Sequence, residues 1–119
     1  MKMFFSLRCQ HIFPVKPLKG TIAMSYTRMN YIEYASEDIA DELEKAYTVN
    51  GPKNFPDALC LVFLRTGPTT ASLTSVYPSK ESYDRATEQR NEAMKKHEGK
   101  IISVRAEEGI ASTFVIKQE

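Results

Sequence analysis

The sequence predicts an α+β fold whose strands and helices follow one another in the order β-α-β-β-α-β. Two observations support this order. Residues 58–77 contain two strand-like runs separated by Gly67-Pro68, a strong turn signal, which predicts an antiparallel hairpin. On each side of the hairpin, a segment rich in helix-forming residues follows a serine, Ser36 or Ser79, and serine is a preferred helix N-cap. The length suits one domain.

The two strands of the hairpin differ in polarity. The first, Ala58–Leu64, is apolar at every position, and because strand side chains alternate in direction, both of its faces are apolar. Such a strand has to be covered on both sides. The second, Thr70–Tyr77, alternates Thr and Ser with apolar residues, so that one of its faces tolerates water.

The first strand and the first helix are predicted upstream of the hairpin. Thr27–Tyr34 is aromatic and β-branched, which favours a strand. Ser36 caps the helix that follows, and the acids Glu37 and Asp38 lie in its first turn, where the helix dipole favours them. We expect this helix to end at Asn50-Gly51-Pro52, since these residues break helices.

The second helix and the last strand follow the hairpin. Lys80–Lys96 is predicted as one helix that ends before Gly99. Ile101–Val104 is either a short strand or an extended connection, and we leave this open. Glu107–Gly109 is interpreted as a turn, and the alternating run Ile110–Ile116 as the last strand.

This order predicts a ferredoxin-like βαββαβ arrangement: a four-stranded antiparallel sheet with both helices on one face. The helices leave the other face of the sheet bare, although Ala58–Leu64 is apolar on both faces. The chain has no spare element to cover it. We therefore expect a homodimer in which two sheets pack face to face.

Charge is unevenly distributed along the chain. Residues 1–32 contain five Lys or Arg and no acid, whereas residues 33–119 hold all 15 acids against 11 bases, a net charge of −4. An acidic body argues against nucleic acid as a partner, because nucleic-acid binding needs clustered positive charge. No stretch approaches the ~20 apolar residues of a membrane span, so we expect no membrane partner.

Residues 1–23 follow no periodic pattern, and we expect a basic N-terminal extension that is poorly ordered, ahead of a domain at 24–119. Three interpretations are open. The apolar centre Met3–Leu7 is short for a secretory signal, whereas a basic, acid-free targeting segment fits the composition. We favour the third, an upstream extension or a start-codon artefact with Met24 as the true beginning.

The cysteines and histidines indicate neither a disulfide framework nor a metal site. Cys9 and Cys60 are widely separated, and the two histidines do not combine with them into the paired spacing of a structural zinc site. Cys60 lies within the most apolar run and is interpreted as a small buried hydrophobe. We expect a reducing, cytoplasmic setting.

The chain resembles the dimeric α+β barrel superfamily over Tyr26–Lys117. The resemblance lies in the element order, the Ser36-Glu-Asp helix start, the Asn54–Ala58 entry to the second strand and the Tyr77–Ser82 entry to the second helix. This superfamily includes antibiotic-biosynthesis-type monooxygenases and muconolactone-isomerase-like, EthD-like and stress-responsive proteins. The resemblance implies a dimer and no cofactor. The cofactor-free monooxygenases use an Asn, a Trp and a Tyr, but this chain has no Trp; haem-degrading relatives need an axial His, but His97 lies at a helix end.

Six polar residues are candidates for binding a small ligand. They are Asn30, Tyr34, Arg65, Ser72, Thr74 and Arg90. Each also has a structural interpretation: the strand residues suit any half-exposed sheet, and Arg90 either extends toward solvent or pairs with an acid such as Glu33. No nucleophile elbow, glycine-rich phosphate loop or metal-ligand cluster occurs in the sequence.

Two functions of different classes fit these observations. The first is a non-catalytic dimeric module that binds a small apolar molecule or has an accessory or stress-related role. The alternative is a cofactor-independent monooxygenase or isomerase acting on a small aromatic or lactone-like compound. A closed cavity in which Asn30, Tyr34 or Arg90 converge would favour the enzyme, and a filled interior would favour the module.

Overall fold

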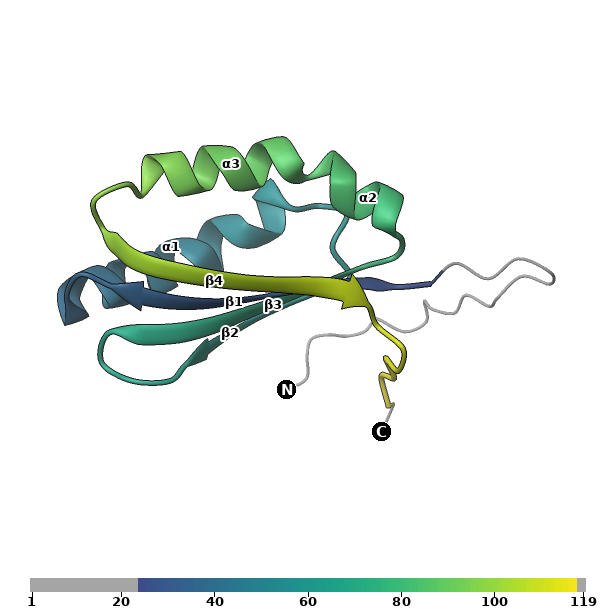
Figure 1. The fold of residues 1–119 in the computed structure, drawn as a ribbon, viewed down its shortest axis with the longest axis horizontal. Coiled ribbons are helices and arrows are strands. Elements are labelled where there is room, and N and C mark those ends of the chain that lie inside the picture. Colours follow the sequence, from purple (N-terminus) through teal and green to yellow (C-terminus); the bar gives the residue numbers. More distant parts are fainter. Residues whose placement is uncertain (1–23, 118–119) are drawn as a thin grey trace, which may run out of the picture.

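A computed structural model describes residues 24–117 of the chain (Figure 1). The predictions for residues 1–23 lie outside this range. The elements in chain order are β1 Tyr26–Tyr34, α1 Glu37–Asn54, β2 Cys60–Arg65, β3 Thr70–Tyr77, α2 Lys80–Arg85, α3 Thr87–Lys96 and β4 Ile101–Ile110.

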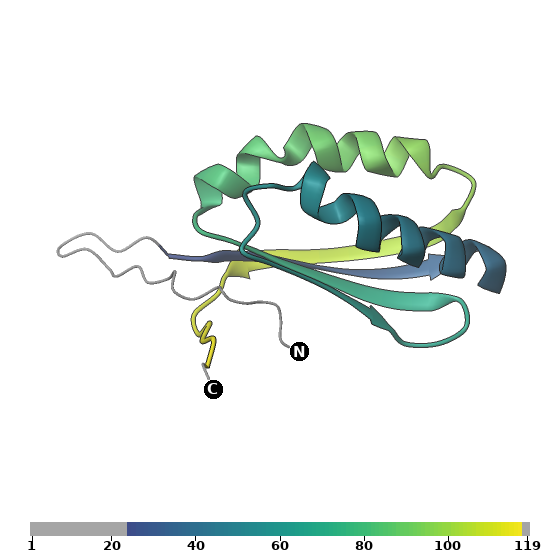
Figure 2. The same cartoon turned by 180° about the vertical axis from the view of Figure 1, so that it is seen from behind.

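The strands form one antiparallel sheet in the order β2-β3-β1-β4, with β2 and β4 at its edges. Figures 1 and 2 show that all the helices lie over the same face of this sheet and that the opposite face carries none. The predicted ferredoxin-like α+β architecture is therefore confirmed. No helix within residues 24–117 is long and apolar enough to cross a membrane.

The strand register assigns each side chain to one face of the sheet. Ile32 of β1 lies opposite Ala71 of β3 and Val104 of β4, so these three point to the same side, and Ile32 packs against α1. We call this the helix face. On the other, open face lie Val62 and Leu64 of β2, whose exposed fractions are 46% and 56%. The second apolar face predicted for this strand thus exists and meets solvent in the single subunit.

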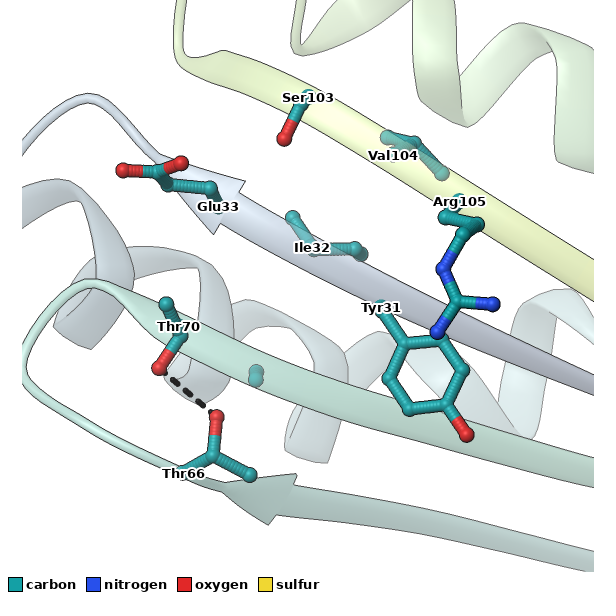
Figure 3. Close-up of a pocket in the computed structure, with 9 residues that line it drawn as sticks. Tyr31, Ile32, Glu33, Thr66, Thr70, Ser103, Val104 and Arg105 are labelled. Carbon is teal, nitrogen blue, oxygen red and sulfur yellow. Dashed lines mark hydrogen bonds between the residues drawn. The ribbon is translucent and has the colours of Figure 1, made fainter.

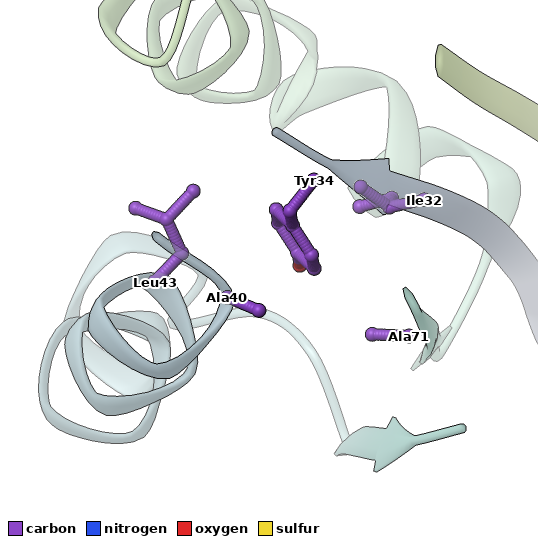
Figure 4. Close-up of a cluster of buried hydrophobic side chains, with 5 residues drawn as sticks. All are labelled: Ile32, Tyr34, Ala40, Leu43 and Ala71. Carbon is purple, nitrogen blue, oxygen red and sulfur yellow. The ribbon is translucent and has the colours of Figure 1, made fainter. Parts of the chain in front are cut away.

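Two small clusters make up the core between the sheet and the helices. The first joins β1, β3 and α1, as Figure 4 shows; its members are Ile32, Tyr34, Ala40, Leu43 and Ala71. The second lies near α2 and contains Tyr77, Tyr83 and Ala86, with Tyr26 and Phe55 packed against it. These clusters hold α1 and α2 on the helix face, whereas α3 has no buried residue.

Both predicted helix caps are confirmed. The Ser36 hydroxyl accepts a hydrogen bond from the backbone N–H of Ile39 at 3.2 Å and so caps α1. The Ser79 hydroxyl accepts one from the N–H of Ser82, whose own hydroxyl accepts one from the N–H of Ser79, both at 3.2 Å. This reciprocal capping box fixes the point at which the chain leaves β3 and enters α2.

The predicted end of the first helix is wrong, because α1 continues through Gly51-Pro52 to Asn54. Gly51 is buried, and a methyl group placed on its Cα would lie 3.6 Å from both Leu61 and Tyr47. This packing against β2 extends the helix past residues that break helices in isolation. The N–H of Phe55 then donates to the carbonyl of Gly51 and closes the last turn.

The single helix predicted over Lys80–Lys96 is divided into α2 and α3 at Ala86. Ala86 has φ −90° and ψ 4°, and its N–H bonds to the carbonyl of Tyr83, three residues back. Its side chain is buried in the second core cluster, with Tyr77 and Tyr83. The tight turn therefore lets α2 pack on the sheet through this cluster, and it changes the direction of the helix axis between α2 and α3.

The prediction for the last strand is also wrong. β4 is Ile101–Ile110, so the run left undecided is a strand, and the predicted turn at Glu107–Gly109 lies within it. Residues 111–117 form no strand. Gly99, at φ +86°, reverses the chain after α3 and leads it directly onto the free edge of β1. Residues 101–110 therefore form the last strand because they lie beside β1, although Ile110–Ile116 alternates more regularly between apolar and polar residues.

Candidate functional site

A polar cluster lies on the helix face, where β1 and β4 meet α2. Arg28 of β1 donates a hydrogen bond from Nη1 to the hydroxyl of Tyr83 at 2.9 Å, and Tyr83 in turn donates to a carboxylate oxygen of Glu108 on β4. The same guanidinium lies 3.5 Å from Glu108. A phenol hydroxyl is thus held between a cation and an anion, in a chain of three groups from three elements.

Aromatic rings and a second arginine surround this chain. The Tyr83 ring centroid lies 4.9 Å from that of Tyr26 and 5.5 Å from that of Tyr77. Arg90 of α3 places its guanidinium carbon 3.8 Å from the Tyr83 ring centroid, a cation–π contact. Its Nη2 donates to the hydroxyl of Thr87 at 3.0 Å. Two guanidinium groups therefore touch the same ring, one at its hydroxyl and the other over its face.

Three polar atoms in this region are shielded from water without a hydrogen-bond partner among residues 24–117. They are Nε of Arg28, Oδ1 of Asn30 and Nη1 of Arg90. Asn30 occupies the next helix-face position of β1 after Arg28, since strand side chains alternate. A shielded polar group that lacks a partner costs about 1–3 kcal/mol, so these atoms mark hydrogen-bonding capacity that the described residues do not use.

Burial raises the pKa of Tyr83, and its hydrogen bond to Glu108 raises it further, while Arg28 and Arg90 oppose the shift. Tyr83 is therefore a neutral phenol at physiological pH. Its hydroxyl accepts a hydrogen bond from Arg28 and donates one to Glu108. Tyr83 therefore links two charged side chains and is not a phenolate nucleophile.

The region beside β4 is open to solvent. Val104 of β4 points to the helix face by its register with Ile32, yet it is 37% exposed. Met94 of α3 is 40% exposed, and the side chain of Glu108 is 42% exposed. α3 therefore leaves part of the helix face of β4 uncovered.

The structure distributes the six predicted ligand-binding residues over four places. Asn30 and Arg90 belong to the region just described. Tyr34 is 2% exposed within the first core cluster, where burial raises its pKa to about 12. Of the two structural interpretations of Arg90, pairing with Glu33 is wrong, because Glu33 is exposed on the open face.

Arg65 lies at the hairpin and binds to α1. Its guanidinium forms ion pairs with Asp41 at 2.8 Å and Glu44 at 2.7 Å, and it donates to the carbonyls of Gly67 and Pro68, each at 2.9 Å. These bonds use the guanidinium of Arg65 to attach the hairpin to α1. Arg65 is therefore not part of the cluster around Tyr83.

Ser72 and Thr74 lie on the open face of β3, opposite Leu64 and Val62 of β2. At one end of this face is a shallow hollow of about 560 Å³ (Figure 3). Its lining includes Tyr31, Glu33, Thr66, Thr70, Ser103 and Arg105. The Arg105 guanidinium lies 4.4 Å from the Tyr31 ring centroid, and Ile32, Ala71 and Val104 also line the hollow, so that polar, aromatic and apolar groups meet there.

Sequence reasoning missed Arg28 and Glu108. Arg28 could have been identified from the sequence. Because side chains alternate along a strand, Arg28 lies on the same face of β1 as Ile32 and Tyr34, which point to the core. Glu108 carried no comparable signal, because its segment was interpreted as a turn. Within residues 24–117 no group of three or more His, Cys, Asp or Glu side chains is placed to hold a metal ion.

No family model and no curated protein matches this sequence. Among solved structures, a dimeric ferredoxin-like protein from an uncultured marine organism matches with a TM-score of 0.63 and 13% identity, over 80% of this chain and 94% of that one. A Streptomyces coelicolor monooxygenase solved with the ligand nanaomycin D matches with a TM-score of 0.59 and 11% identity, over 80% and 94%.

The haem degrader MhuD of Mycobacterium tuberculosis matches with a TM-score of 0.53 and 19% identity, over 76% of this chain and 98% of that one. Each of these matches covers nearly the whole of the other chain, so the likeness extends over the entire domain. At such identities it concerns the fold. The chain accordingly has the ferredoxin-like fold found in dimeric ferredoxin-like proteins and in monooxygenases of the antibiotic-biosynthesis type, as its sequence predicted.

Proposed function

We propose that this chain is a small-molecule-binding module, with an accessory role, whose ligand site is the region around Arg28, Tyr83 and Arg90 on the helix face. The observation that carries this proposal is the set of shielded polar atoms without partners on Arg28, Asn30 and Arg90. A ligand that bonds to them would remove their desolvation cost, which a purely structural cluster leaves uncompensated. Val104 and Met94, both partly exposed, offer apolar surface on the β4 side of the helix face.

We further propose that the module is a homodimer joined through the open face. Val62 and Leu64 leave about half of their surface in water there, and a second sheet would cover them. A protein of similar fold is described as dimeric. Cys60 is a free thiol on the same face. Because free thiols are typical of reducing compartments, we also propose a cytoplasmic location.

The alternative is a cofactor-independent monooxygenase or isomerase acting on a small aromatic or lactone-like compound. One observation favours it: the Tyr83 hydroxyl lies between Arg28 and Glu108, an arrangement that is able to deliver or accept a proton. One structure of similar fold is a monooxygenase with a bound ligand. Against it, Tyr34 and Arg65 lie elsewhere, so the predicted residues do not form one reactive centre.

The binding proposal is tested with 2-naphthol, a neutral aromatic probe, in an amide-resolved NMR titration of the full chain. We expect saturable shifts at Arg28, Tyr83 and Arg90, and unchanged signals at Val62 and Leu64. Shifts confined to Val62 and Leu64, or no saturable shift at all, would contradict the proposal. Incubation of the same complex in air distinguishes the binding module from the enzyme, because an oxidised or isomerised product would favour the enzyme.

A further inference from the structure

The charges around the Tyr83 ring are not balanced. Arg28 and Arg90 both contact this ring, but Glu108 is the one carboxylate that contacts the cluster among residues 24–117. Arg28 is paired with Glu108 at 3.5 Å, whereas Arg90 forms no ion pair within the described residues. A guanidinium keeps its proton at any physiological pH, so the region holds one uncompensated positive charge.

The unused donors belong to these same two arginines. Nη1 of Arg90 and Nε of Arg28 are both shielded from water and lack an acceptor within residues 24–117. Nη2 of Arg90 donates to Thr87, and the guanidinium carbon lies 3.8 Å from the Tyr83 ring centroid, so two contacts hold the group in place before any ligand arrives. Preorganised guanidinium donors of this kind suit planar acidic groups such as carboxylates.

Exposed apolar surface lies on the same side of the sheet as this positive charge. Met94 follows Arg90 by one helical turn on α3, and Val104 lies on the helix face of β4; both are more than one-third exposed. The Tyr26 ring adds an aromatic surface next to Tyr83. A ligand that matches both features carries an aromatic body and one anionic group.

We infer that the helix-face site binds an aromatic carboxylate, with the carboxylate on Arg90 Nη1 and Arg28 Nε and the ring against Met94 and Val104. This inference rests on the proposed function and narrows it to a ligand class. The anion neutralises the unpaired charge and satisfies both donors at once. A neutral aromatic of the same shape would gain the apolar contacts alone.

Isothermal titration calorimetry of the full chain with 2-naphthoate and with 2-naphthamide, its neutral isostere, tests this inference. We expect 2-naphthoate to bind at least about tenfold more tightly, the factor that one charge-assisted hydrogen bond supplies. Arg90→Gln should abolish this preference while still binding 2-naphthamide. Arg85→Gln is the matched control, because Arg85 is exposed on α2 and contacts Asp57 instead; it should keep the preference.

The outcomes separate the two proposals. Equal affinity of the native chain for both compounds would overturn the anionic ligand class and leave the binding module intact. Binding of neither compound would overturn both proposals. A preference for 2-naphthoate that survives in Arg90→Gln would also overturn the inference. If thermal unfolding shows Arg90→Gln to be misfolded, Arg90→Met, which keeps the apolar stem on Tyr83, has to show the same loss.

Discussion

Charging the open face of the sheet should dissociate the proposed dimer. The double substitution Val62→Lys with Leu64→Lys places two ammonium groups on the half-exposed apolar surface of β2, and a second sheet packed on this face would have to bury both charges. Full burial of a Val or Leu side chain is worth about 1.5–3 kcal/mol. Since these side chains are 46% and 56% exposed, covering the remainder contributes about 1 kcal/mol each.

A two-fold interface presents each side chain twice, so the native chain gains about 4 kcal/mol from these four side chains. Losing it weakens the dimer Kd by about a thousand-fold, before any cost of desolvating lysine. Sedimentation equilibrium over a range of protein concentrations measures this shift directly. Val49→Lys is the control, because Val49 is 56% exposed on α1, away from the open face, and the Kd should stay unchanged.

Two results would refute the reasoning. An unchanged Kd in the double variant would mean that the open face is not the interface. A native chain that stays monomeric at every concentration would mean that solvent covers Val62 and Leu64 in the functional state. Circular dichroism of the double variant establishes that the subunit still folds, as expected for residues that do not contact the helices.

Three further outcomes are expected from the core and the ionisable groups. Leu43→Ala, at a site 6% exposed, should lower the free energy of unfolding by about 2–4 kcal/mol in urea titration; a loss below 1 kcal/mol would contradict its place in the core. Burial raises the pKa of Tyr34 and Tyr47 to about 12, so unfolded tyrosine loses its proton first and stability should fall between pH 10 and 12; absorbance titration showing ordinary tyrosine pKa values would contradict this. Burial beside Lys100 and Lys96 lowers the pKa of His97, so the unfolded chain binds the proton more readily and stability should fall as pH drops through 6.5; His97→Gln should flatten that slope in thermal melts, and an unchanged slope would count against it.

Local chemistry explains the parts of the fold that were predicted correctly. Ser36 and Ser79 cap their helices through contacts within three residues, and Gly67-Pro68 joins β2 to β3, so no distant partner is needed. The strand Thr70–Tyr77 was predicted with its observed bounds, because alternation and β-branching are also local properties. Element order followed from these signals, and the sheet with helices on one face followed from the order.

The errors occurred where a distant element decided the local structure. α1 passes Gly51-Pro52 because it packs on Leu61, and the helix after β3 bends at Ala86 because the second core cluster receives that side chain. Both contacts depend on how a helix packs on the sheet, which helix propensity and breaker residues do not report. Ile110–Ile116 has a better strand pattern than the segment before it, but hydrogen bonds to β1 are available to residues 101–110 instead.

For the candidate site, Asn30 and Arg90 were identified from the sequence, but their neighbour Arg28 and the carboxylate of Glu108 were not. By itself the sequence determined the element order, the helix caps, the hairpin and the surplus apolar face of β2. Only the tertiary structure decided where helices end, which run becomes the edge strand, and that two arginines from β1 and α3 meet on one tyrosine ring. The reason is physical: caps, turns and alternation act over a few residues, whereas Arg28 lies 55 positions from Tyr83 and 80 from Glu108, and only sheet register and helix packing bring them together.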